Sequence, residues 1–378
     1  MASPLSPVVV LGRFPPPADG QTLATERCAS FLDDVFDVRR LDTQAPGADP
    51  LTAHPRFDLG RTLHYVGLRR RLAATLRETP TAPVLWHAVS PARWGHLRDV
   101  LATAPAFAPD QPVVAVFHRA GFESLFESAV TARTAARLVR QLSAVVFHSQ
   151  ALADRCADVI PESKVRLIPN TVRDAAVLSA EAASARRAEG PGTPLRVLFL
   201  SNLLPEKGFA DVLEAVGQLH GRGVAVEATF AGRWPDATTR VAFEDRARAL
   251  GVRVAIPGAV ADPAEIRRLH LDADVFALPT THPTETQPIA ILEALAAGTP
   301  VVSVDRPILR DMMADGVEGA LVRPHDPAAL ADAIGRLAEP APWRLASSAA
   351  RARFEAAFSP AIVGGLWQAL AAEWMAAS

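Results

Sequence analysis

The chain has 378 residues, a formal net charge of −2, 49% hydrophobic residues and 21% charged residues. This length exceeds that of one ordinary hydrophobic core, so we expect two domains. The charge gives no support to nucleic-acid binding, which normally requires a strongly basic surface. No apolar run reaches the roughly 18 residues of a membrane helix. A globular protein in solution is therefore expected.

The amino terminus and the cysteines indicate the cellular compartment. The opening MASPLSPVVVLGRF has no basic stretch before its short apolar run, so we interpret it as a first strand rather than a signal peptide. Cys28 and Cys156 are too few for a disulfide framework or a cysteine metal site. A cytoplasmic protein with reduced thiols is the expectation.

Short apolar runs alternate with helical patterns through the first half, as in parallel sheets covered by helices. The strand candidates are PVVVLG, VLWHAV, PVVAVFH, AVVFHS and VRLIP. Residues 175–194 then lose apolar periodicity and end in Gly and Pro, as an interdomain linker does. We predict a domain boundary near residues 172–193.

The same alternation restarts after this segment. The strand candidates are LRVLFLS, VAVEATFAG, VRVAIPG, DVFALP, PVVSV and GALVRP. We predict an α/β protein of two doubly wound parallel-sheet domains, residues 1–178 and 192–355, with residues 356–378 as a helix packing toward the first. Ligands of such sheets bind outside the carboxyl ends of the strands, so we expect a site in the cleft between the domains.

The stretch ALPTTHPTETQPIAILEALAAGTPVV, residues 277–302, reads as strand, loop, helix and strand. Pro288 suits the first turn of the helix and Gly298 its C-terminal cap. A helix start binds phosphate oxygens, and carboxylates such as Glu285 and Glu293 accept sugar hydroxyls. The spacing alone equally allows Glu285 to be a helix-dipole partner and Glu293 an ordinary exposed residue.

Other candidates follow strands in the same way. In VLFLSNLLPEKGFADVLEAV, Lys207 and Gly208 open a helix after a strand. His118 and His148 end the strands VVAVFH and AVVFHS, where each is either cleft-lining or structural. Gly20 precedes a predicted helix, where it serves a turn or exposes amides to a phosphate. The histidines show no metal-ligand spacing.

The 277–302 stretch resembles the E-x7-E signature of retaining glycosyltransferases of the GT-B fold, family 4, including LEALAAGTPVV after the second glutamate. The resemblance implies that Glu285 and the neighbouring Thr286 and Gln287 hold the transferred sugar, and that Glu293 binds the ribose of the nucleotide. Thr286 stands where many members have glycine.

The segment around Lys207 resembles the G-R-L-x-x-x-K-G element of that family. This implies that Lys207 faces the diphosphate and stabilises the leaving group. Asn202 takes the place of the arginine in that element, and Arg233 is the cation expected to compensate. The resemblance also implies that His118 contacts the sugar and that Gly20 belongs to an acceptor-facing loop.

These implications define an expected enzyme. It is a retaining, metal-independent glycosyltransferase of polysaccharide or glycoconjugate biosynthesis, using a UDP-, GDP- or ADP-sugar, with no cofactor and no nucleic-acid partner. The acceptor is a glycan, a lipid-linked saccharide or a small molecule. The basic run at residues 68–77 is either a solvated helix face or a peripheral contact with the inner face of the membrane. A nucleotide-sugar epimerase and a non-catalytic sugar-binding subunit remain alternatives.

Overall fold

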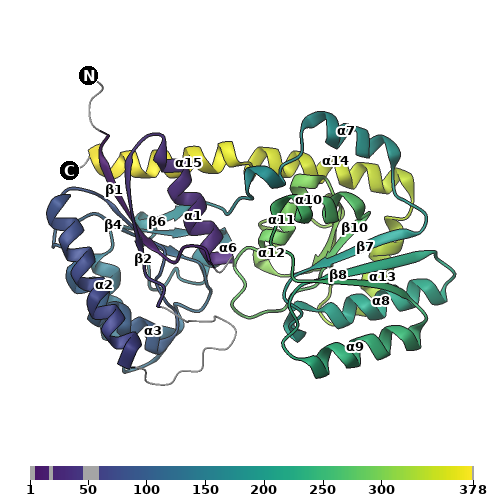
Figure 1. Cartoon of the computed structure of the whole chain (residues 1–378), viewed down its shortest axis with the longest axis horizontal. Coiled ribbons are helices and arrows are strands. Elements are labelled where there is room, and N and C mark those ends of the chain that lie inside the picture. The colour runs from purple at the N-terminus through teal and green to yellow at the C-terminus, as the bar shows by residue number, and fades with distance from the viewer. Residues whose placement is uncertain (1–4, 17–19, 46–58, 377–378) are drawn as a thin grey trace. The chain divides into compact units, whose positions relative to one another are not determined.

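The structure is a computed structural model that describes residues 5–16, 20–45 and 59–376 (Figure 1). The chain forms two compact units, which we call unit 1 (residues 1–170 and 363–378) and unit 2 (residues 171–362). Each contains a six-stranded sheet in which every described pairing is parallel. The predicted architecture of two Rossmann-like parallel-sheet domains is therefore confirmed.

The sheet of unit 1 has the strand order β2-β1-β3-β4-β5-β6. The sequence prediction missed β2, which is an edge strand. Its residues, DVRRLD, form no apolar face, and all of them are partly or fully exposed. The other strands coincide with predicted apolar runs. The strands are β1 (Pro7–Gly12), β2 (Asp37–Asp42), β3 (Val84–Trp86), β4 (Val113–Phe117), β5 (Ala144–Phe147) and β6 (Val165–Leu167).

Helices cover both faces of this sheet, because successive strand residues point to opposite sides. Val9 and Leu11 pack in one apolar cluster with α2, whereas Val8 and Val10 pack in another with α1 and α15. The terminal helix thus contributes to the core of unit 1. The helices are α1 (Gly20–Asp33), α2 (Leu59–Glu78), α3 (Arg93–Arg98), α4 (Ser124–Glu127), α5 (Ala132–Gln141), α6 (Gln150–Asp154) and α15 (Pro360–Ala376).

The basic run at residues 68–77 lies on α2. Leu68, Leu72 and Leu76 are buried against the sheet, and Arg69 and Arg70 are exposed. The arginines thus occupy the solvated side of an amphipathic helix. None of the helices in the described ranges has both the length and the apolarity needed to cross a bilayer.

The sheet of unit 2 has the order β12-β11-β10-β7-β8-β9. All six strands lie within the runs that the sequence predicted. They are β7 (Leu195–Leu200), β8 (Val226–Ala231), β9 (Arg253–Gly258), β10 (Val275–Leu278), β11 (Val301–Val304) and β12 (Gly319–Val322).

Two layers of helices enclose this sheet, with α8, α9 and α13 on one face and α10, α11 and α14 on the other (Figure 1). The layering is that of a doubly wound fold. The helices are α7 (Ala180–Glu189), α8 (Phe209–Gly221), α9 (Ala237–Leu250), α10 (Pro263–Asp272), α11 (Ile289–Ala297), α12 (Pro307–Arg310), α13 (Pro327–Arg336) and α14 (Pro340–Ala357).

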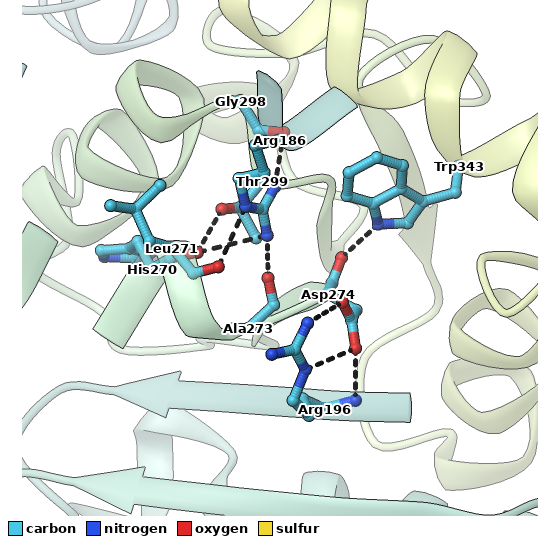
Figure 2. Close-up of polar contacts among 9 residues, drawn as sticks. All are labelled: Arg186, Arg196, His270, Leu271, Ala273, Asp274, Gly298, Thr299 and Trp343. Carbon is cyan, nitrogen blue, oxygen red and sulfur yellow. Dashed lines mark hydrogen bonds and ion pairs between the residues drawn. The ribbon is translucent and has the colours of Figure 1, made fainter. Parts of the chain in front are cut away.

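Helix α7 lies within the segment that the sequence predicted to be a linker. Arg186 of this helix is buried and donates hydrogen bonds to the carbonyl oxygens of Leu271, at 3.0 Å, and of Ala273 (Figure 2). Its guanidinium carbon also lies 5.1 Å from the centre of the Trp343 ring, within cation-π range. Ala183 of the same helix also packs in a buried cluster with Leu178 and Ala297. The segment is therefore part of the fold of unit 2.

Each strand order contains a switch point, where the chain reverses the direction in which it adds strands. In unit 2 this point lies between β7 and β10, and in unit 1 between β1 and β3. Loops that leave neighbouring strands in opposite directions open a crevice there, which is where doubly wound sheets bind ligands. The residues that follow these strands are therefore the candidates for ligand contacts.

Candidate functional site

Lys207 is positioned by a close approach of two loops in unit 2. After β7 the chain makes one 3-10 turn, Pro205–Lys207, and reaches Gly208 with φ of 79°. A Cβ at Gly208 would lie 2.6 Å from the carbonyl oxygen of Pro279, in the loop that follows β10. Only glycine permits both this left-handed backbone and this contact. The predicted opening of a helix by Lys207 and Gly208 is thus formed at the switch point.

Glu285 lies directly against Lys207. The Lys207 ammonium forms an ion pair with Oε2 of Glu285, and the two side chains are 15% and 13% exposed. The hydroxyl of Thr280 donates to the same carboxylate oxygen at 3.2 Å. The amide of Thr281 donates to the carbonyl of Glu206 at 2.7 Å. A charge pair and a backbone hydrogen bond therefore join the loops after β7 and β10.

Arg306, which was not among the predicted site residues, supports the same loop from the next strand. Its Nη1 donates to the carbonyl oxygens of Thr280 and His282, at 3.2 and 3.1 Å. The available signal was its position just after β11, at the same edge of the sheet. Arg306 acts on the backbone that carries Glu285, so we regard it as a positioning residue.

Helix α11 begins beside this pair. It starts at Ile289, so Pro288 occupies the N-cap position and not the first turn, where it was predicted. No side chain in the described ranges caps the helix. Gly298 ends the helix with φ of 67°, as its predicted role as a C-terminal cap requires. The amide of Ile291 donates to the carbonyl of Pro288 at 3.1 Å, whereas those of Ile289 and Ala290 have no intrahelical acceptor and lie at the positive end of the helix dipole.

Three of the predicted residues accompany this helix. Thr286 and Gln287 precede it and are buried, at 6% and 5% exposure. Glu293 lies in the second turn with partial access to solvent. Loss of solvation raises the pKa of its carboxyl group to about 7, although the charge of Arg173 acts in the opposite direction. Glu293 is therefore half protonated near neutral pH, unlike an ordinary exposed glutamate.

Asn202 and Arg233 follow neighbouring strands. Asn202 comes two residues after β7 and Arg233 two residues after β8, and both are exposed. The amide of Leu203 donates to the carbonyl of Arg233 at 2.9 Å, which ties the two segments together. Both residues thus lie at the carboxyl edge that carries Lys207.

Unit 1 brings three histidines together at its own carboxyl edge. Nδ1 of His87 lies 2.9 Å from Nε2 of His118, and Nδ1 of His118 lies 3.0 Å from Nε2 of His148. Burial lowers the pKa of His87 to about 3 and that of His148 to about 4, and holds the pKa of His118 well below its ordinary value. The three rings are therefore neutral at physiological pH.

His87 was not singled out from the sequence, although it follows the strand VLW as His118 and His148 follow theirs. Its carbonyl oxygen accepts a hydrogen bond from the side-chain amide of Gln21 at 2.8 Å. Gly20, predicted to precede a helix, is instead the first residue of α1. The loop segment at residues 17–19 lies outside the described residues. The start of α1 is thus tied to the histidine group.

Two family models match the chain. Residues 194–340, within unit 2, match the model described as "Glycosyl transferases group 1". Residues 28–175, almost wholly within unit 1, match the model described as "Glycosyltransferase Family 4". Together they extend over most of both sheets.

Curated relatives show the same kind of similarity. The chain is 31% identical over 187 residues to a D-inositol 3-phosphate glycosyltransferase of Acidothermus cellulolyticus, covering 47% of this chain and 41% of that protein. It is 32% identical over 180 residues to a phosphatidyl-myo-inositol mannosyltransferase of Mycobacterium leprae, covering 47% and 45%. The aligned regions thus span less than half the length of these relatives.

Solved structures match over nearly the whole chain. HepE (Alr3699) of Anabaena in complex with UDP and glucose superposes with a TM-score of 0.69 at 20% identity, covering 99% of this chain and 100% of that one. Sucrose-phosphate synthase (tll1590) of Thermosynechococcus elongatus superposes with a TM-score of 0.71 at 18% identity and the same coverage. At such identity the likeness establishes the fold.

Proposed function

Because the chain belongs to the family 4-like glycosyltransferases of the GT-B fold, we propose that it transfers a sugar from a nucleoside diphosphate sugar to an acceptor hydroxyl. The observation that carries this proposal is the contact between Lys207 and Glu285 at the switch point, beside the start of α11. A cation and a helix start suit a diphosphate, whereas a carboxylate suits sugar hydroxyls. A nucleotide sugar contains both groups.

In the proposed arrangement, Lys207 and the first-turn amides of α11 receive the diphosphate. Its negative charges compete with Glu285 for the ammonium, and Glu285 is then available to accept hydrogen bonds from the sugar. Glu293 accepts from the ribose. Asn202 and Arg233 supply further donors from the ends of β7 and β8. Charge that develops on the leaving phosphate is stabilised by groups already in position.

We further propose that transfer retains the anomeric configuration. In this course the acceptor attacks from the face of the departing diphosphate, whose oxygen takes the proton of the acceptor hydroxyl. Lys207 and the helix dipole favour that departure without a bound cation. In this proposal the start of α1 at Gly20 faces the acceptor, and His118 contacts the transferred sugar.

A donor panel tests the proposal. Purified protein would be incubated with UDP-, GDP- and ADP-sugars, with and without acceptors that include D-inositol 3-phosphate and simple glycans. EDTA would be added in parallel. We expect release of one nucleoside diphosphate, faster with the right acceptor, unaffected by EDTA and yielding a product of retained configuration by NMR.

The other outcomes separate the alternatives. An epimerised donor without nucleotide release would indicate an epimerase of the same fold. Binding of a nucleotide without turnover of any donor would indicate a non-catalytic subunit, for which Asn202 at the place of an arginine is the motivating feature. A product of inverted configuration would refute the retaining course.

A further inference from the structure

His87, His118 and His148 occupy three adjacent strands of unit 1. They follow β3, β4 and β5, which are neighbours in the sheet. His118 and His148 come directly after the register pair Phe117 and Phe147. The line continues beyond His148, whose Nδ1 lies 2.9 Å from the carbonyl oxygen of Ile168, just after β6. Parallel strands thus align three imidazoles end to end.

The carbonyl at the end of the line fixes the direction of every hydrogen bond. A carbonyl oxygen only accepts, so Nδ1 of His148 carries the hydrogen. In a neutral ring the other nitrogen is then bare, and Nε2 of His148 accepts from Nδ1 of His118. By the same step, Nε2 of His118 is bare and accepts from Nδ1 of His87. All three rings are therefore Nδ1-H tautomers.

The far end of the line agrees with this direction. Nε2 of His87 is fully buried and has no polar partner among the described residues. In the derived tautomer this atom is a bare acceptor. If the line ran the other way, Nε2 would be an orphaned buried N-H and the Ile168 carbonyl would face a lone pair. A buried donor without an acceptor is the rarer and more costly defect.

The ring of His87 is packed against neighbouring segments on two sides. Its ring packs on that of Trp367 in α15, with centroids 5.5 Å apart. A Cβ on Gly12 would lie 2.9 Å from the His87 Cβ, so the backbone of β1 closes another side. His148 is held by its hydrogen bond to the carbonyl oxygen of Ile168. His118, between them, is the member that keeps partial exposure.

We propose that His87 and His148 are positioning residues that hold His118 as a hydrogen-bond acceptor, with the bare Nε2 as the atom that receives a substrate hydroxyl. His148 fixes the tautomer, and the N-H of His87 occupies the acceptor atom in the free protein. A hydroxyl of the sugar or of the acceptor that takes this place leaves the N-H of His87 without that partner, so its contact must contribute more than the hydrogen bond it replaces. His118 therefore accepts from the substrate and does not donate to it. The identity of the hydroxyl rests on the proposed function, whereas the tautomer does not.

The tautomers can be read directly by NMR. In long-range proton–nitrogen spectra of 15N-histidine-labelled protein, the protonated and bare nitrogens of a neutral imidazole have distinct shifts and distinct couplings to the ring protons. Single variants at each histidine assign the signals. We expect His87, His118 and His148 all as Nδ1-H. An Nε2-H signal for any of the three would overturn the proposal, whether or not the protein proves to be an enzyme.

Two variants test the positioning role. H148Q places an amide oxygen near the position of Nε2 and can still accept from His118, whereas H148F keeps a ring without an acceptor. We expect H148Q to keep His118 as Nδ1-H and H148F to lose that single tautomer. With an active donor and acceptor pair, kcat/KM should fall about tenfold in H148F and change less than about threefold in H148Q.

Failure of the function and failure of this inference give different results. K207A should abolish transfer and leave the histidine spectrum unchanged. If H148F scrambles the tautomer of His118 but leaves kcat/KM unchanged while its melting temperature is normal, the positioning role is refuted. If the wild type turns over no donor but shows the three Nδ1-H tautomers, the hydrogen-bonded line stands and the reaction must be sought elsewhere.

Discussion

Lys207 and Glu285, 78 positions apart in the sequence, form an ion pair at the point in unit 2 where β7 and β10 send their loops in opposite directions. Neither loop alone encodes this contact. It arises because parallel strands bring their carboxyl ends to one edge, and because Gly208 lets the loops approach.

Removing either member of the pair should abolish transfer. K207A deletes the cation for the leaving diphosphate, and E285A deletes the acceptor for the sugar, so we expect turnover to fall by at least about 100-fold in each. Donor turnover and circular dichroism measure activity and folding. R246A is the matched control, since it removes an exposed ion pair with Glu214 in the same unit. Activity near that of the wild type in K207A would contradict the assigned site.

Gly208 and Gly223 make a matched pair for testing the loop approach. Their φ angles are 79° and 81°, so alanine strains the backbone equally at both. A Cβ at Gly208 meets Pro279, whereas one at Gly223 meets nothing within 4 Å. We expect G223A to lose about 1–2 kcal/mol of unfolding free energy and keep its activity. G208A should lose more stability and most of its activity. Equal stability and activity in the two variants would show that the approach is not required.

Glu293 should make nucleotide binding depend on pH. Its pKa of about 7 means that a ribose hydroxyl meets a protonated carboxyl at pH 6 and a carboxylate at pH 8. Affinity for the preferred nucleoside diphosphate should therefore rise through pH 7 in the wild type, beyond any rise seen in E293Q. Isothermal titration calorimetry measures both. The same slope in the two proteins would remove Glu293 from the ribose site.

The same carboxyl group should also affect stability. Its pKa is higher in the folded state than the ordinary 4.5, so folding binds a proton between these values, and stability falls as pH rises from about 4.5 to 7. The loss persists above pH 7. E293Q should thus melt at a higher temperature than the wild type at pH 8, with the difference disappearing near pH 4.5.

His270 should limit the stability of unit 2 in acid. It is fully buried, neither ring nitrogen has a polar partner among the described residues, and burial lowers its pKa to about 3. Because the unfolded chain binds the proton more readily, stability falls below pH 6.5 by about 1.4 kcal/mol per pH unit from this group. H270L should melt higher than the wild type at pH 7, and the difference should grow towards pH 5.

The control for His270 is H220L, at an exposed position on α8. Calorimetric melting at pH 5, 6 and 7 would compare the three proteins. A constant difference between H270L and the wild type across this range would show that His270 is not held neutral. A gain of similar size in H220L would assign the effect to added apolar surface.

Much of the fold was predictable because buried parallel strands are continuous apolar runs. The same logic located Lys207 and Glu285, since each follows such a run. Edge strand β2 was not predicted, because Arg39 and Arg40 face solvent there and no apolar run marks the strand. Helix α7 was not predicted because its attachments are to distant segments: Arg186 bonds to carbonyls more than 80 positions away, and Ala183 packs against Ala297.

The histidine line was only partly predictable, for a related reason. His118 and His148 each follow a clear strand, but their contact requires β4 and β5 to be neighbours in register. Including His87 also requires the strand order of the sheet, in which β3 lies between β1 and β4. Strand order is set by packing between distant segments, and single-sequence patterns do not contain it.

The last residues of α15 bear on how the protein is made. Val363, Trp367 and Leu370 complete the apolar cluster that contains Val8 and Val10. Unit 2 ends at residue 362 and is therefore whole before these residues leave the ribosome. The strands of unit 1 are thus synthesised before unit 2, but their core is completed after it. Without residues 363–376, Val8 and Val10 of β1 would lack the apolar side chains of α15 that pack on them.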